Sequence, residues 1–168
     1  LHRPRSKGVA IHLHGFGDDA WGGSSPRVKE LSDWDALLFT FRGRDQHPEV
    51  ACTLGAWERF DVVAAVAFLE SQHIPRTQMV LVGNSMGAGV SLLALRELEK
   101  NGGPLAGALL ESPFRDLHQA ADDHIRYFLG PVTFLAVPAI RIGLYWCGKK
   151  ANFNPAEVSP CQAAQGLK

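Results

Sequence analysis

The sequence predicts one α/β domain in which a central, mostly parallel sheet has helices on both faces. Short apolar runs alternate along the chain with segments that have helical periodicity, which is the order of βαβ units. The apolar runs are continuous rather than alternating, as in strands covered on both sides. A chain of 168 residues with 46% hydrophobic residues is also long enough to bury one sizeable core.

Four strands are predicted, at Val9–Leu13, Ala36–Phe41, Met79–Gly83 and Leu105–Leu110. Each run is short and bounded by polar, glycine or proline residues, which suits a buried strand better than a helix. Helical segments separate them, so we expect right-handed crossovers and parallel pairing.

The helices between the strands are predicted from start signals, periodicity and stop signals. Ser25-Pro26 opens the first helix, with serine as the N-cap and proline at the first helical position. The third helix runs from about Met86 to Lys100 and ends at the glycines of residues 101–103. The second helix is predicted from apolar residues at helical spacing: Trp57, Phe60, Ala64, Ala67 and Phe68.

The segment Asp122–Gly148 is strongly apolar, but two arginines and two prolines interrupt it. These residues argue against a membrane span. We expect a pair of helices that cover a cleft. The domain organisation predicted from this order is a core at residues 1–121, a helical cap or lid at 122–150, and a return segment at 151–168 that leads to a further strand.

Composition excludes several classes of function. Lys plus Arg and Asp plus Glu number 17 each, so the overall charge gives no argument for nucleic acid or an anionic membrane as partner. The cysteines Cys52, Cys147 and Cys161 are isolated and form no CxxC pair, which favours a reduced, cytoplasmic protein over a zinc or thioredoxin-like one. The sequence leaves the compartment and the oligomeric state open.

Residues 81–89, LVGNSMGAG, surround Ser85 with small residues directly after a predicted strand and before a predicted helix. This context predicts a nucleophile elbow, a sharp strand–turn–helix corner that lifts the serine hydroxyl above the sheet edge. Side chains two positions before and after the serine would collide across the bend. Gly83 and Gly87 remove that collision.

A second motif follows the first strand, where residues 14–17 read HGFG. Together with the elbow it resembles the α/β-hydrolase superfamily, in particular its serine esterase and serine aminopeptidase-like branches. The resemblance implies an α/β-hydrolase fold and an oxyanion hole made by the backbone N–H groups of Phe16 and Met86. It also implies that the loop around these donors consists of His14, Gly15 and Gly17.

The resemblance covers nearly the whole chain, although Arg44-Asp45 stands where the family commonly has a glycine-rich turn. In the family the acid and the histidine of the triad follow later strands, which we expect beyond Lys168. The chain is therefore expected to be a fragment of a larger hydrolase. Within the chain, Glu111 is the candidate acid and Asp116 an alternative; His118 and His124 are the candidate bases.

The leading hypothesis is a serine hydrolase that cleaves an ester, or less readily an amide, without a cofactor and without a metal. Apolar cap residues suggest an acyl substrate: Phe128, Phe134, Leu135, Leu144 and Trp146. One alternative is a metal-dependent hydrolase that uses His12 and His14. The other is a hydrolase-like module that binds a small molecule without turning it over.

Overall fold

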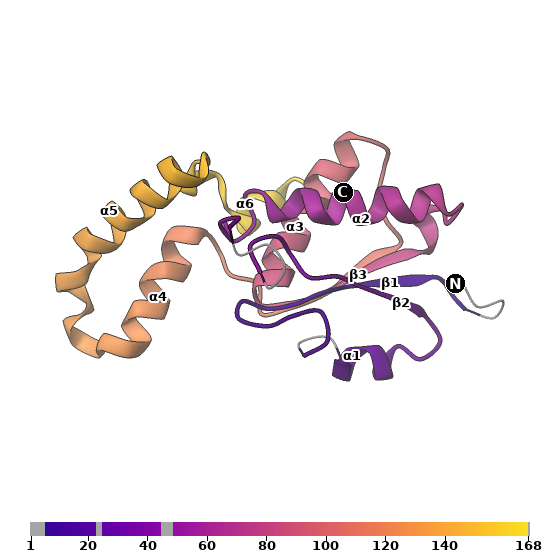
Figure 1. The fold of residues 1–168 in the computed structure, drawn as a ribbon, viewed down its shortest axis with the longest axis horizontal. Coiled ribbons are helices and arrows are strands. Elements are labelled where there is room, and N and C mark those ends of the chain that lie inside the picture. The colour runs from indigo at the N-terminus through magenta and orange to yellow at the C-terminus, as the bar shows by residue number, and fades with distance from the viewer. Residues whose placement is uncertain (1–5, 23–24, 45–48, 168) are drawn as a thin grey trace.

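The computed structural model describes residues 6–22, 25–44 and 49–167 (Figure 1). Its sheet contains four strands, β1 (Val9–Leu13), β2 (Asp35–Leu38), β3 (Met79–Asn84) and β4 (Gly107–Glu111). They lie in the order β2-β1-β3-β4, and every neighbouring pair is parallel. The predicted parallel α/β class is thereby confirmed.

Helices lie on both faces of this sheet, as Figure 1 shows. Helix α1 (Ser25–Glu30) covers one face, while α2 (Glu58–Ser71) and α3 (Met86–Lys100) cover the other. A 3-10 turn, η1 (Arg76–Gln78), leads into β3. All strands run in the same direction, so the loops that leave their carboxyl ends gather at one edge of the sheet, where ligand sites of such folds lie.

The core is formed mainly where β1 and β3 meet α2 and α3. Ile11, Val62, Leu81 and Val90 are fully buried in this cluster. A second, smaller cluster packs on the other side of α3 and includes Leu93, Leu117, Val158 and Ala163. Central strands and helix α3 are therefore the best-packed elements, and they carry the predicted elbow between them.

Two long helices form a projecting arm, which we define as residues 117–151. Helix α4 (Leu117–Leu129) leads through the 3-10 turn η2 (Gly130–Val132) into α5 (Thr133–Ala151). The two helices pack on each other and extend beyond the sheet (Figure 1). In the described part of the chain, no helix is both long and apolar enough to cross a bilayer.

After the arm the chain returns to the body. The 3-10 turn η3 (Pro155–Glu157) and helix α6 (Pro160–Gln165) follow, and α6 packs against α3. The side chain of Ser159 accepts a hydrogen bond from the backbone N–H of Gln162, which caps α6.

Some bounds differ from the sequence prediction. Strand β2 ends at Leu38 and not at Phe41, because the backbone N–H of Phe41 donates to Nε2 of His14 (3.1 Å) instead of to a strand. Strand β4 begins at Gly107 and not at Leu105; just before it, the N–H of Ala106 donates to the carbonyls of Arg76 and Met79. The predicted pair of helices exists, but it begins earlier, at Leu117, and it extends beyond the sheet (Figure 1). That it covers a cleft stays a prediction.

Candidate active site

Ser85 lies between β3 and α3, at the carboxyl edge of the parallel sheet, and is exposed. Its backbone has φ 51° and ψ −112°. A non-glycine residue in this region of φ/ψ space is strained and is retained only where its surroundings determine the conformation. The prediction of a strained serine at a strand–turn–helix corner is confirmed.

The glycines around Ser85 are required by close backbone contacts. A Cβ atom on Gly83 would lie 2.7 Å from the carbonyl oxygen of Gly87. A Cβ atom on Gly87 would lie only 2.1 Å from the carbonyl oxygen of Leu13, at the end of β1. Side chains at these two positions would push the elbow away from the neighbouring strand, so both must lack a Cβ.

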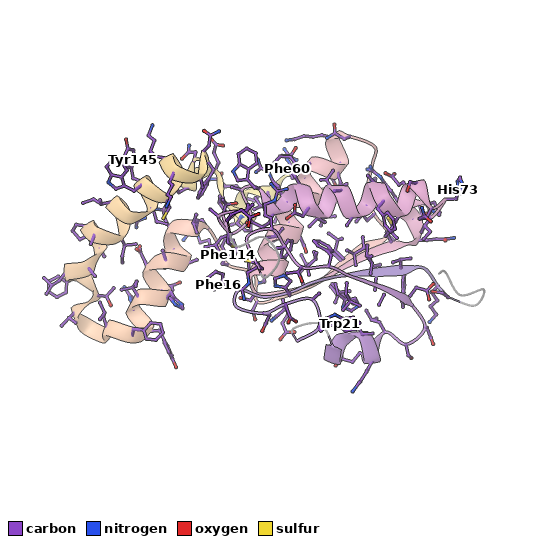
Figure 2. The ribbon with its side chains drawn as sticks, viewed as in Figure 1. Phe16, Trp21, Phe60, His73, Phe114 and Tyr145 are labelled. Carbon is purple, nitrogen blue, oxygen red and sulfur yellow. The ribbon has the colours of Figure 1, made fainter. Side chains whose placement is uncertain are left out.

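A third glycine, Gly89, was not assigned a role from the sequence. Its Cβ would lie 2.3 Å from the ring of Phe114, so Gly89 allows the segment after β4 to cross over the first turn of α3. In the sequence, Gly89 is the last residue of LVGNSMGAG, and that position could have indicated a close contact at the first turn of the helix. Figure 2 shows Phe114 and Phe16 near the end of the sheet that faces the arm.

The loop with HGFG leaves the sheet beside the elbow. Leu13 is paired with Gly83 in the β1–β3 ladder, so the residues that follow each of them leave at the same edge. A Cβ on Gly15 would lie 3.6 Å from the side-chain nitrogen of Asn84, the residue before Ser85. Phe16 is 62% exposed. The two motifs are therefore neighbours.

His14 is buried and both of its ring nitrogens have partners in the protein. Nδ1 lies 2.8 Å from the carbonyl oxygen of Gly15, and Nε2 accepts a hydrogen bond from the N–H of Phe41. These contacts fix the tautomer with a proton on Nδ1. The ring therefore orders the loop, and its lone pair is not available to a metal ion or a substrate proton.

The turn after this loop is held by the protein itself. The N–H of Asp18 donates to the carbonyl of Gly15 (3.3 Å). The carboxylate of Asp19 accepts the N–H groups of Gly22 (2.7 Å) and Trp21 (2.8 Å), and these hydrogen bonds hold its pKa below the ordinary value. The loop backbone is thus fixed on both sides of Phe16.

On its other side the elbow pairs with β4. The N–H of Ser85 donates to the backbone carbonyl of Glu111 (2.9 Å), and Asn84 is paired with Glu111 in the β3–β4 ladder. Glu111 therefore lies at the strand end next to the serine. Asp116, the alternative acid, is engaged elsewhere: its side chain caps α4 by accepting the N–H of Gln119 (2.8 Å).

Among the described residues, no histidine forms a hydrogen bond with Ser85. His12 is buried in β1. His118 is half-buried in the first turn of α4, and the ring of His124 contacts Phe128 (5.1 Å between centroids). Within the described ranges, no group of three or more His, Cys, Asp and Glu residues could hold a metal ion.

A buried carboxylate supports the loop that packs on α3, and sequence reasoning missed it. Glu58 is fully buried and accepts three hydrogen bonds of 2.7 Å, from the N–H and hydroxyl of Thr53 and the N–H of Gly55. Two of the three donors are backbone N–H groups. Every residue except proline has one, so the sequence does not show which of them bind Glu58. Gly55 in turn packs on Leu93 of α3.

The five apolar cap residues differ in their exposure on the arm. Phe128, Phe134, Leu135 and Trp146 are between 65% and 70% exposed on the arm, and only Leu144 packs against the second core cluster. The acyl substrate that was inferred from these residues stays a prediction.

Comparisons with known proteins agree with this architecture. The sequence model of the Alpha/beta hydrolase family matches residues 10–162. The structure is similar to that of an esterase/lipase from an uncultured bacterium, with a TM-score of 0.56 and 23% identity over 83% of this chain and 48% of that chain. It is also similar to an esterase of the bacterial hormone-sensitive lipase family, with a TM-score of 0.59 and 25% identity over 99% of this chain and 57% of the other.

This chain therefore spans about half the length of the solved structures that it resembles. The search of curated proteins found no match.

Proposed function

Because this chain belongs to the alpha/beta hydrolase family, we propose that it provides the nucleophile of a serine hydrolase that cleaves a carboxylic ester. The conformation of Ser85 is the observation that carries the proposal. An exposed serine at φ 51°, with glycines two positions away on either side, has no structural need for that residue type, since glycine would adopt the conformation without strain.

In the proposed reaction, Oγ of Ser85 attacks the carbonyl carbon of the ester, and a histidine takes the hydroxyl proton. The same proton then leaves with the alcohol, and water hydrolyses the acyl-enzyme. No cofactor enters these steps. Amide cleavage would follow the same course with a poorer leaving group.

The oxyanion is proposed to bind the backbone N–H groups of Phe16 and Met86. The proposal is supported by the neighbouring positions of the two motifs and by the first turn of α3, whose N–H groups and dipole favour negative charge. Loss of one such donor costs about 10²–10³ in rate.

Glu111 is the proposed acid of the triad, because it ends the strand next to Ser85. Its role would be to orient the histidine and stabilise its charged form. Glu111→Gln is then expected to lower kcat with little change of KM, whereas a carboxylate that only anchors its loop would lower the free energy of unfolding instead.

The test is labelling of the purified protein with a fluorophosphonate, together with hydrolysis of p-nitrophenyl butyrate. Labelling, and any hydrolysis that the wild-type chain shows, are expected to be lost in Ser85→Ala and kept in Ser71→Ala, in which an exposed serine at the end of α2 is removed. Hydrolysis that survives Ser85→Ala would contradict the proposal.

A second candidate is a module that binds its ligand without turnover. It is favoured by the described histidines, none of which hydrogen-bonds Ser85. A folded protein that binds an ester analogue but is neither labelled nor active would support this candidate over the hydrolase.

A further inference from the structure

The arm exposes an unusual number of large apolar side chains around its outer turn. We define the tip as six of these residues, which are 44% to 85% exposed: Tyr127, Phe128, Leu129, Val132, Phe134 and Leu135. They follow one another closely in the sequence, from the end of α4 to the start of α5 (Figure 1). A contiguous apolar surface of this kind marks a site of interaction.

The apolar surface continues along α5. Ile142, Tyr145 and Trp146 are 57% to 65% exposed, and their spacing from Leu135 places them on one side of the helix. The opposite side carries Val137, Ile140 and Leu144, which are half-buried. Helix α5 is therefore apolar on two sides, and only one of them is covered. Figure 2 shows Tyr145 on the arm, away from the sheet.

Beyond Asp123 the charged side chains of the arm are all basic; its two acidic residues, Asp122 and Asp123, lie in α4. Residues 124–156 contain no Asp or Glu, so all 17 carboxylates lie elsewhere, and the cations in this stretch are Arg126, Arg141, Lys149 and Lys150. Arg141 pairs with Asp122 (2.6 Å). Within the described residues the other three cations have no ion pair. The balanced charge of the whole chain conceals this local excess of positive charge.

We propose that the arm docks on an anionic lipid surface, with the tip and the outer side of α5 in the interface. Exposed tyrosine and tryptophan suit that boundary, since each has an apolar ring and a polar edge. Basic residues near the surface add electrostatic attraction to anionic headgroups. A second copy of the arm is a poorer occupant, because it would bring the same positive charge to the contact.

Docking does not require the Ser85 hydroxyl, and the candidate bases His118 and His124, although they lie in the arm, are not among the positions substituted below. It can therefore be tested on Ser85→Ala as well as on the wild type, and failure of one proposal leaves the other standing.

The experiment is flotation of the protein with vesicles of phosphatidylcholine, with and without phosphatidylglycerol. We expect binding to the mixed vesicles and little to phosphatidylcholine alone. Lys149→Gln/Lys150→Gln should weaken binding about five-fold for each charge removed, and added salt should weaken it further. Phe128→Ser/Phe134→Ser should weaken it about ten-fold or more.

Matched controls separate these effects from a general loss of folding or charge. Phe68→Ser removes a phenylalanine that is 55% exposed, near the far end of α2. Lys29→Gln/Lys100→Gln removes two exposed lysines outside the arm. Both should bind like the wild type, and circular dichroism should show that every variant is folded. Equal binding to both kinds of vesicle, equal loss in the controls, or dimerisation through the arm without vesicle binding would each overturn the proposal.

Discussion

Gly87 is the residue at which the helix of the elbow touches the first strand. An alanine there would place its Cβ against the Leu13 carbonyl, and that backbone cannot move without disturbing the β1–β3 ladder. Gly87→Ala is therefore expected to lower the free energy of unfolding in urea by about 1–3 kcal/mol and to abolish ester hydrolysis. Gly143→Ala is the matched control, since its Cβ meets nothing within 4 Å and an alanine should stabilise α5 by about 0.5–1 kcal/mol.

Glu58 illustrates the cost of a single buried atom. Glu58→Gln would turn an amide N–H₂ group toward donors at Thr53 and Gly55, leaving at least one buried donor without an acceptor. We expect a loss of about 1–3 kcal/mol in the free energy of unfolding. The same change at the exposed Glu70, which pairs with Arg76, should cost about 1 kcal/mol or less. Equal losses at both positions would contradict this account.

Burial also controls the chemistry of one cysteine. Burial raises the pKa of the Cys52 thiol, and because the thiolate is the reactive form, alkylation requires a higher pH. At about pH 8, iodoacetamide should modify the exposed Cys147 and Cys161 first, as peptide mass spectrometry would show. As the pH rises, the rate of Cys52 modification should approach the rates of the two exposed cysteines. Reaction of all three at one rate would indicate that the loop around Cys52 is open.

At the scale of elements, the start of α4 depends on one side chain. Asp116 accepts the N–H of Gln119 and so satisfies one of the free donors of the first turn. Asp116→Ala should lower the free energy of unfolding by about 0.5–2 kcal/mol, and Asp116→Asn should restore most of it. Thermal denaturation followed by circular dichroism would measure both. No loss in the alanine variant would mean that α4 is held by packing of Leu117 alone.

Elements whose ends are determined by residues within or next to them could be predicted from the sequence. Helix α3 was predicted from Met86 to Lys100, as observed, because glycines determine both of its ends. The end of β2 could not be predicted, because it is set by a hydrogen bond from Phe41 to the distant His14. The start of α4 was not predicted, because the prediction used apolar periodicity and did not use Asp116 as a helix N-cap.

The candidate site divides in the same way. The elbow could be predicted from local sequence: Ser85 has the expected strained backbone, and Gly83 and Gly87 have backbone atoms too close for a Cβ. Which carboxylate lies next to the elbow depends on the order of strands in the sheet, because the β3–β4 ladder pairs Asn84 with Glu111. The support from Glu58 depends on backbone donors and has no sequence pattern.

For the whole molecule, the uneven distribution of buried contacts predicts uneven stability. The sheet and α3 form the main core, while most large side chains of the arm are exposed. Amide hydrogen exchange should therefore be slowest in β1, β3 and α3, and faster in the middle of α4 and α5. Mass spectrometry of the peptic peptides would measure it. Arm amides protected as strongly as those of β1 would show that the arm unfolds only with the body.

The position of β1 between β2 and β3 has a consequence for synthesis on the ribosome. Val9 of β1 is paired with Met79 of β3, so one side of the first strand waits for a partner that is translated roughly 70 residues later, several seconds at about 5–20 residues per second. During that interval an apolar, β-prone strand has an open edge, a state prone to aggregation. The chain's yield in a host cell should therefore depend on chaperones and on the speed of translation between residues 39 and 78.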